Sequence, residues 1–282
     1  MTLDSACRRA RAGRRRLLVG FQVHDALYNG GMGGGMGVFI GTSGWHYEHW
    51  RDVFYPPDLR PKEYLAFYAR HFSTVEVNNT FYQLPTAGTV SNWAATTPAG
   101  FTFALKASQY ITHRKRLKDP ETTLGRFMGI ASLLGEKVGP LLFQLPPRFK
   151  VDLPRLEVFL DALPRSGHYA FEFRDHSWFV PQVRDALIRH NAGFCLYDQA
   201  GLVTPVWITA PFVYVRLHGP GDMCQGRYSE EMLKPHAARI LEWADEGKQI
   251  FCYFNNDSMG NAVENARMLI EMLGPSATRL SE

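Results

Sequence analysis

The stretch Thr74–Phe81, which reads T-V-E-V-N-N-T-F, decides the fold of this 282-residue chain. Its first half alternates β-branched and polar residues, and its Asn pair ends the run, which is typical of a short strand followed by a turn. Runs of this kind recur along the chain, and a segment with the apolar spacing of a helix separates most of them. This alternation predicts parallel strands joined by helices.

The number of such units determines the architecture. Eight strand candidates lie at Val38–Trp45, Thr74–Phe81, Thr102–Ser108, Pro140–Leu145, Tyr169–Asp175, Gly193–Gln199, Phe212–Gly219 and Gln249–Asp257. Helix candidates lie at Pro61–His71, Leu124–Leu134, Pro154–Leu163, Pro181–His190, Glu230–Glu246 and Asn261–Leu273, whereas helix signals are poor around Val90–Ala95 and in Ala200–Ala210. Eight units predict a single (β/α)8 TIM barrel of the α/β class, with an open doubly wound sheet as the alternative. No G-x-G-x-x-G motif follows a strand, which disfavours the open sheet.

The composition is that of a folded protein, with 45% hydrophobic and 21% charged residues. No apolar run approaches the roughly 18 to 20 residues that cross a bilayer, so we expect no membrane partner. The net charge of +4 lies entirely in residues 1–36, which hold six arginines against two aspartates, so the remaining chain is neutral. We therefore interpret this segment as a dispensable extension, and a basic tail that binds nucleic acid is the less favoured interpretation.

The sequence divides into three segments. Residues 1–36 form a basic, Gly-rich extension that we expect to be flexible, residues 37–275 form the barrel, and residues 276–282 form a C-terminal tail. Met32 or Met36 is a candidate initiator, with the upstream residues as a leader. The arginines are not followed by the apolar core of a secretory signal, so we expect a cytoplasmic location.

Strand alternation predicts which side chains face the barrel interior, because successive residues point to opposite faces. In the run Val75–Asn78 the valines suit the helix side, which turns Glu76 and Asn78 inward. The same split gives further inward residues, namely Lys106, Gln144, Glu172, Arg174, Arg216 and His218, with Asp198 and Asn255 from the sixth and eighth strands. These residues lie at the carboxyl ends of strands, where barrel enzymes build their active sites.

A ring of this kind also has a purely structural interpretation. The acids Glu76, Glu172 and Asp198 equal in number the bases Lys106, Arg174 and Arg216, so the six side chains would satisfy one another without any ligand. Buried ion pairs are poor stabilisers, because removing each ion from water costs several kcal/mol. An apolar interior would be the simpler solution, so we favour a ligand site.

Several motifs identify relatives of the chain through their number and order. They are G-T-S-G-W-H-Y-E-H-W (Gly41–Trp50), F-Y-P (Phe54–Pro56), V-E-V-N-N-T-F-Y (Val75–Tyr82), I-T-H-R (Ile111–Arg114), Q-L-P-P (Gln144–Pro147), E-F-R-D-H-S-W (Glu172–Trp178), Y-V-R-L-H-G (Tyr214–Gly219) and Y-F-N-N-D (Tyr253–Asp257). Through them the chain from about Phe39 to Leu273 resembles the YecE-like family, also called domain of unknown function 72. The resemblance implies a TIM barrel and assigns no activity or catalytic residue. The segment before Met36 departs from the family pattern.

The favoured functional hypothesis is an enzyme acting on a phosphorylated, nucleotide-like or otherwise anionic polar substrate. Lys106, Arg174 and Arg216 would hold the anion together with His113, Glu76 or Glu172 would be the general base, and His218 would be the acid. Further substrate-binding candidates are Asn78, Gln144, Trp178, Asp198, Asn255 and Asn256. Trp45, Tyr82 and Trp178 are candidates for stacking on a base or sugar ring.

Three alternatives remain open. A divalent metal bound by Glu76, Glu172, Asp198 and His218 would support a hydrolase or isomerase, although the adjacent cations disfavour it and no cofactor is predicted. A glycosidase would use Glu76 and Glu172 as a carboxylate pair, and fails if each is salt-bridged to an arginine. A binding module would hold a small anion or nucleic-acid end without turnover. The loop 219–226 is either a lid or an ordinary turn, and no oligomeric state is predicted.

Overall fold

The computed structural model describes residues 37–199, 202–221 and 224–274. Its strands are β1 (Val38–Thr42), β2 (Thr74–Val77), β3 (Thr102–Lys106), β4 (Val138–Gln144), β5 (Tyr169–Glu172), β6 (Gly193–Gln199), β7 (Leu202–Val203), β8 (Phe212–Leu217) and β9 (Gln249–Phe254). Its α-helices are α2 (Tyr64–Tyr68), α3 (Asn79–Tyr82), α4 (Ala87–Thr96), α5 (Pro120–Ala131), α6 (Leu153–Asp161), α7 (Pro181–Arg189), α8 (Glu230–Asp245) and α9 (Asn261–Leu273). Shorter helical turns are η1 (Glu48–Trp50), η2 (Pro61–Glu63), η3 (Tyr110–Arg114), η4 (Ser132–Lys137), η5 (His176–Trp178) and η6 (Ser258–Gly260).

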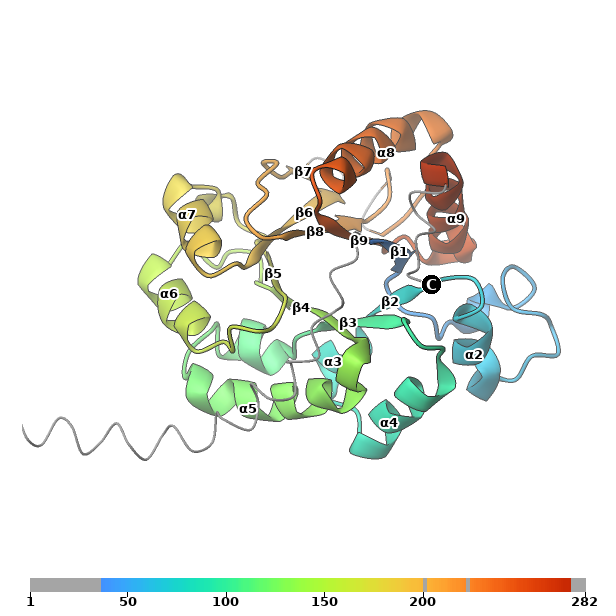
Figure 1. The fold of residues 1–282 in the computed structure, drawn as a ribbon, viewed down its shortest axis with the longest axis horizontal. Helices are drawn as coiled ribbons and strands as arrows, with labels where there is room; N and C mark the ends of the chain where they lie inside the picture. The colour runs from blue at the N-terminus through green and yellow to red at the C-terminus, as the bar shows by residue number, and fades with distance from the viewer. Residues whose placement is uncertain (1–36, 200–201, 222–223, 275–282) are drawn as a thin grey trace, which may run out of the picture.

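Eight parallel strands form a nearly closed barrel within the described residues, which confirms the predicted TIM-barrel architecture (Figure 1). The strand order is β1-β9-β8-β6-β5-β4-β3-β2, and the ring is completed between β1 and β2 by a single parallel bridge from Ser43 to Glu76. The two strands approach closely at this seam. A Cβ atom at Gly41 would overlap the backbone oxygen of Thr74, so only glycine fits there.

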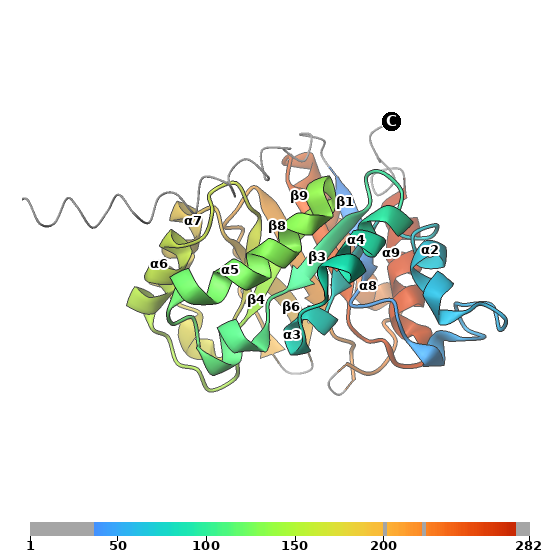
Figure 2. The same ribbon diagram turned by 90° about the horizontal axis from the view of Figure 1, so that it is seen from below.

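Helices surround the barrel, and Figure 2 shows α4 and α5 covering the strands from outside. Each of the six helix candidates contains or overlaps an α-helix. The poorly signalled segment at 90–95 is also helical, as the middle of α4, where the side chain of Thr86 accepts from the backbone N–H of Thr89 at 3.2 Å and caps the first turn.

The other poorly signalled segment, after β6, holds no helix in its described part. Strand β7 turns back and pairs antiparallel with β6, and residues 204–211 continue in irregular conformation to β8. Figure 1 accordingly shows extended chain rather than a helix between α7 and α8. A cavity of about 290 Å³ lies here, between the outer faces of β6 and β8 and helix α8.

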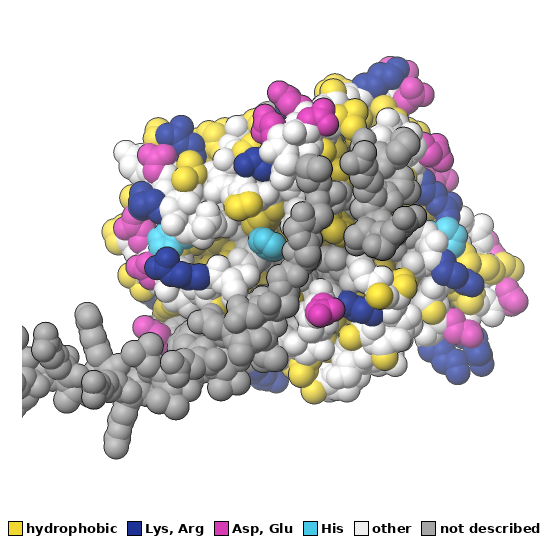
Figure 3. All heavy atoms as spheres, in the orientation of Figure 1, with side chains coloured by type: hydrophobic (Ala, Val, Ile, Leu, Met, Phe, Trp, Pro, Cys, Tyr) yellow, Lys and Arg dark blue, Asp and Glu magenta, His cyan; other side chains and the backbone are white. Residues whose placement is uncertain are grey.

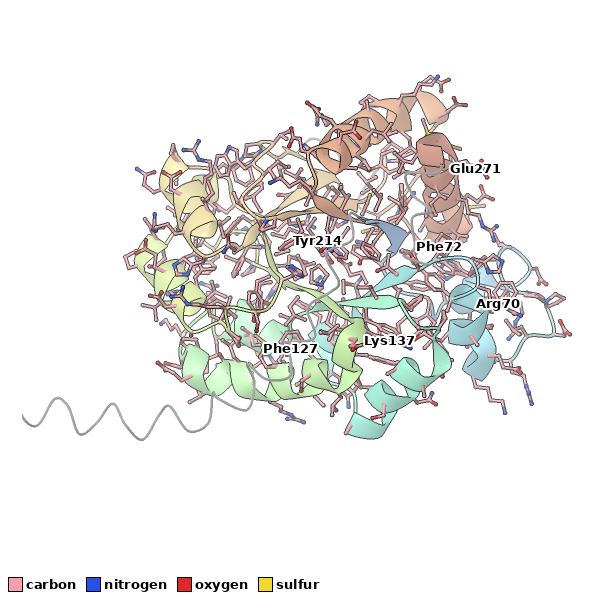
Figure 4. The ribbon with its side chains drawn as sticks, viewed as in Figure 1. Arg70, Phe72, Phe127, Lys137, Tyr214 and Glu271 are labelled. Carbon is pink, nitrogen blue, oxygen red and sulfur yellow. The ribbon has the colours of Figure 1, made fainter. Side chains whose placement is uncertain are left out.

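Two apolar cores follow from the alternation of the strands. The larger core lies between the strands and the helices, and Phe127 of α5 belongs to it (Figure 4). The smaller core fills the barrel interior, where Figure 4 shows Tyr214 inside the ring of strands. Its members are Ala104, Leu142, Ala170, Cys195, Ala210, Phe212, Tyr214, Phe251 and Tyr253. The interior is thus packed at mid-depth, and polar side chains above it lie at the carboxyl ends of the strands.

The predicted segments at the two ends cannot be compared with the structure, because residues 1–36 and 275–282 lie outside the described residues. The barrel itself starts where expected, with β1 beginning at Val38. Within the described ranges, none of the helices has the length and apolarity needed to cross a membrane.

Candidate active site at the barrel mouth

Arg216 of β8 lies at the centre of the polar ring, with 1% of its surface exposed. Its Nε donates to Oε2 of Glu76 at 2.9 Å and its Nη2 donates to Oε1 of Glu76 at 2.8 Å, which makes a bidentate pair with β2. Its Nη1 donates to Oε2 of Glu172 in β5 at 2.7 Å. We call Arg216, Glu76 and Glu172 the Arg216 network, and it ties three strands together across the barrel.

The carboxylate of Glu76 is fully occupied. Besides Arg216, it accepts hydrogen bonds from the hydroxyl of Ser43 at 2.7 Å and from the hydroxyl of Tyr214 at 2.7 Å. A carboxylate whose two oxygens each accept two or more hydrogen bonds has no lone pair directed at a ligand. Glu76 therefore positions Arg216 and is poorly placed for the predicted role of general base.

Glu172 is held between two arginines. Its second oxygen, Oε1, accepts from Nε of Arg174, which also donates to Gln199 through Nη1 and lies over the Tyr197 ring at 4.6 Å. Burial alone would raise the pKa of Glu172, but Arg174 and Arg216 outweigh burial and hold the pKa below its ordinary range. Each of the two glutamates is salt-bridged to an arginine, which is the condition under which the glycosidase interpretation fails.

His218 is buried at the end of β8 between two partners. Its Nε2 lies 3.0 Å from Nη2 of Arg174, and its Nδ1 lies 2.9 Å from the side-chain amide of Asn255. A guanidinium only donates, so Nε2 accepts from Arg174. Burial, followed by the charge of Arg216, lowers the pKa of His218 well below its ordinary value. The ring is neutral, which argues against its predicted role as an acid.

The predicted inward orientation of Asp198 is wrong. Its carboxylate faces outward to the helix layer, 3.8 Å from His236 of α8 and 3.3 Å from the hydroxyl of Tyr228. The reason is alternation: Cys195 of the inner core and Gln199, which meets Arg174, face inward, so the residue at 198 must face outward.

This correction changes the charge of the mouth. The inward ring holds two acids, Glu76 and Glu172, against the bases Lys106, Arg174 and Arg216, and three minus two leaves +1. Among the described residues, no carboxylate oxygen lies within the 4.0 Å ion-pair distance of the Lys106 ammonium. The surplus positive charge is therefore that of Lys106.

Lys106 lies at the end of β3 in a cluster with few polar partners. Its Nζ is 4.4 Å from the centroid of the Phe81 ring, and the same ring contacts His113 edge-on at 4.8 Å. Asn78, one position beyond the last paired residue of β2, has a buried side-chain oxygen without a hydrogen-bond partner and does not cap α3. We call these four residues the Lys106 cluster.

His113 belongs to η3, which is a single π-helical turn. Within it the backbone N–H of Lys115 donates to the oxygen of Tyr110 at 2.9 Å, five residues back. The Nδ1 of His113 lies 2.9 Å from the hydroxyl of Thr112, and burial, followed by the charge of Lys106, lowers the pKa of the ring. Such turns are rare and often occur at functional sites.

The predicted aromatic platform is mostly core. Trp178 is fully buried, stacks on Phe173 at 4.8 Å and donates from its indole to the oxygen of Phe149 at 2.6 Å, so its predicted ligand contact is wrong. Trp45 is likewise buried, with an edge contact to Trp93. Only Tyr82, which is 73% exposed, keeps a surface that a ligand can reach.

The two asparagines after β9 have different positions. Asn255 joins the mouth, where it meets His218 and lies 3.3 Å from the Cys224 sulfur. Asn256 is buried and donates to the backbone oxygen of Gly226 at 2.8 Å and to Asn265 at 3.0 Å, so it secures a loop rather than facing the mouth. Gln144 ends β4 beside Glu172 and is partly exposed.

Several mouth residues were missed by the sequence analysis. Gln199 and Tyr197 both have inward parity in β6, so the alternation that identified Arg216 held the signal for them. Ser43 follows β1 in the G-T-S-G motif, and only the three-dimensional bridge to Glu76 shows its role. No group of three or more His, Cys, Asp or Glu side chains able to hold a metal is found within the described ranges.

Comparison with known families decides where the chain belongs. The family model described as "Protein of unknown function DUF72" matches residues 39–282. The chain is a member of the DUF72 family. This match covers the whole barrel, and it agrees with the resemblance carried by the sequence motifs.

Relatives in the DUF72 family have names but no stated activity. The UPF0759 protein YunF of Bacillus subtilis is 27% identical over 271 residues, which cover 84% of this chain and 94% of YunF. The UPF0759 protein YecE of Escherichia coli is 32% identical over 144 residues, about half of each chain.

Solved DUF72 structures share the fold. One from Thermotoga maritima is 29% identical and superposes with a TM-score of 0.77, covering 84% of this chain and 99% of its own. One from Enterococcus faecalis is 20% identical with a TM-score of 0.73, over 84% and 95% of the two chains. The family and the barrel fold are thus established, and the side chains at the barrel mouth are the guide to its chemistry.

Proposed function

We propose that this DUF72 protein is an enzyme acting on a small anionic polar substrate, which it binds at the barrel mouth. The observation that carries the proposal is the +1 charge of the inward ring, which resides on a lysine without a carboxylate partner. A phosphate or carboxylate would supply the missing anion. Arg174 supports the same site, because its guanidinium retains some exposure at the mouth.

The residues divide by role under this proposal. Glu76, Glu172 and His218 are positioning residues, because arginine partners occupy them. The groups left to touch a ligand are Lys106, His113 and Asn78. Gln144 on the adjacent strand β4 and Asn255 after β9 are further contacts. Chemistry is therefore expected on the β2–β3 side of the mouth.

A nucleic-acid end would present the same phosphate chemistry. The six arginines that favoured this partner lie in residues 1–36, outside the described structure. Figure 3 shows the opposite end of the barrel, where the strands begin, and there basic and acidic side chains of the described residues are interspersed. At the mouth, the inward ring carries a surplus of one positive charge, which suits one small anion better than a nucleic-acid backbone. We therefore favour a small molecule, and the test includes both sources of phosphate.

Thermal unfolding with added ligand tests the proposal. Inorganic phosphate should raise Tm in the wild type, because a ligand at 100 times its Kd stabilises the native state by about 2.7 kcal/mol. The rise should vanish in Lys106→Met and persist in Lys118→Met, a matched loss of an exposed ammonium. A 5′-phosphorylated dinucleotide should stabilise no more than phosphate alone. No rise in the wild type, or an equal rise in Lys106→Met, contradicts the proposal.

A further inference from the structure

The lysines of this chain differ in the groups that surround their ammonium nitrogens. Two of them form ion pairs within their own segment: Lys115 lies 2.9 Å from Asp119, and Lys234 lies 3.4 Å from Glu230. Lys137 donates to three oxygen atoms at the end of α4. Lys106 is partly buried, its ammonium lies over the face of the Phe81 ring, and within the described structure no carboxylate comes within ion-pair distance of it.

The surroundings of Lys106 favour the neutral amine. Burial, followed by the positive charge of Arg216, lowers its pKa from 10.5 to about 8. A larger share of the molecules would then carry a neutral amine near neutral pH than for an ordinary lysine, which is almost entirely protonated there. A neutral amine has a free electron pair, so it can attack a carbon atom as well as hold an anion.

Two neighbours suit a reaction at this nitrogen. The neutral ring of His113 contacts the opposite side of the Lys106 cluster through Phe81 and is available to carry protons. The side-chain oxygen of Asn78, at the end of the neighbouring strand β2, is buried without a donor, and a rotation of this side chain would present it to a ligand hydroxyl. A compound with a carbonyl next to a hydroxyl would meet both requirements, and its anionic group would face the positive mouth.

We propose that Lys106 forms an imine with small hydroxy-carbonyl compounds that carry a phosphate or carboxylate. The amine nitrogen attacks the carbonyl carbon, and a proton passes from nitrogen to the former carbonyl oxygen, which gives a carbinolamine. Loss of that oxygen as water leaves the C=N bond, so no oxidant or reductant is needed. The inference rests on the proposed function, because it identifies the substrate class of the same site and adds a covalent step.

Reductive trapping tests the imine. The full-length protein is incubated with dihydroxyacetone phosphate and then with sodium borohydride, which donates hydride to the imine carbon and fixes a secondary amine. We expect one addition with the mass of the probe less one oxygen atom, mapped to the peptide that contains Lys106. Lys106→Arg should lose it and Lys118→Arg should keep it. Dihydroxyacetone without phosphate should label far less, and excess inorganic phosphate should suppress labelling.

The pH dependence separates Lys106 from ordinary lysines in the unmodified protein. Labelling of Lys106 should rise with pH and level off above a midpoint near 8, whereas labelling of a lysine in a short model peptide should still be rising there. This measurement needs no variant, so it remains decisive if Lys106→Arg fails to fold.

The outcomes distinguish the two proposals. Phosphate-dependent stabilisation without labelling at Lys106 overturns the imine and leaves the anion site intact. Labelling spread evenly over exposed lysines, or retained in Lys106→Arg, also overturns the imine. Absence of both phosphate stabilisation and labelling overturns both proposals together.

Discussion

The two sides of the barrel mouth solve the problem of buried charge in opposite ways. In the Arg216 network, the arginine has acceptors on three of its nitrogens, and Glu76 adds Ser43 and Tyr214 as donors. In the Lys106 cluster, an ammonium and an amide oxygen lack partners. A satisfied network contributes shape and rigidity, whereas unsatisfied groups cost stability and persist where a ligand uses them.

The largest change in stability is expected at Arg216, where it tests whether the Arg216 network holds the fold together. Arg216→Met should destabilise the fold by about 3 to 5 kcal/mol, because two buried glutamates lose their counter-charge. Urea unfolding followed by circular dichroism measures the change. Arg216→Lys should recover only part of it, since an ammonium cannot reproduce the bidentate pair. A loss below about 1 kcal/mol would show that the network is not structural.

Lys106→Met should change the free energy of unfolding in the opposite direction from Arg216→Met. Removing a partly buried ammonium that has no carboxylate partner should stabilise the fold at pH 7 by roughly 1 to 3 kcal/mol, while ligand binding is lost.

The sign of its pH dependence follows from the lowered pKa. Between about 8 and 10.5 the unfolded chain binds more protons at Lys106 than the folded chain, so wild-type stability rises with pH there. The advantage of the Met variant should thus shrink between pH 7 and 9.5. A variant less stable than wild type throughout this range would contradict the assigned cost of Lys106.

Asp198→Asn should have the smallest effect on stability of these variants. Because Asp198 lies outside the inward ring, this variant shows what the loss of a carboxylate does when it does not face the mouth. The Asp198–His236 pair spans 3.8 Å and is partly exposed, so we expect a change below about 0.5 kcal/mol and no change in phosphate binding. Matched urea and thermal-shift measurements on the wild type provide the reference. Lost phosphate binding in this variant would restore Asp198 to the mouth.

The fold was predictable because strand and helix periods are local. The eight strands appeared in the pattern, and α4 was faint because Thr, Ser, Asn and Gly dilute its helix signal, while burial of Val90 holds it in place. Parity found Glu76, Glu172 and Arg216 for the same local reason.

The rest of the site could not be predicted from the sequence, since pairing is a property of three dimensions. Inward parity alone cannot show that Arg216 takes both glutamates and leaves Lys106 without one. Asp198 was predicted to face inward because it is polar, although its position in the alternation of β6 places it on the outer face. Trp178 was misplaced because an aromatic after a strand fits a ligand platform and a helix-layer core equally well.

The π turn η3 has an evolutionary consequence for this mouth. A π turn contains one residue more than an α turn, so deletion of a single codon would convert it into an α turn. The side chains that follow the deleted residue in the helix would then rotate about the helix axis by about 100°. His113 would then leave the Phe81 ring, while β3 and α5 on either side would keep their own hydrogen bonds. Descendants of one barrel can thus gain or lose this histidine by a one-residue length change, without redesigning the wall that carries it.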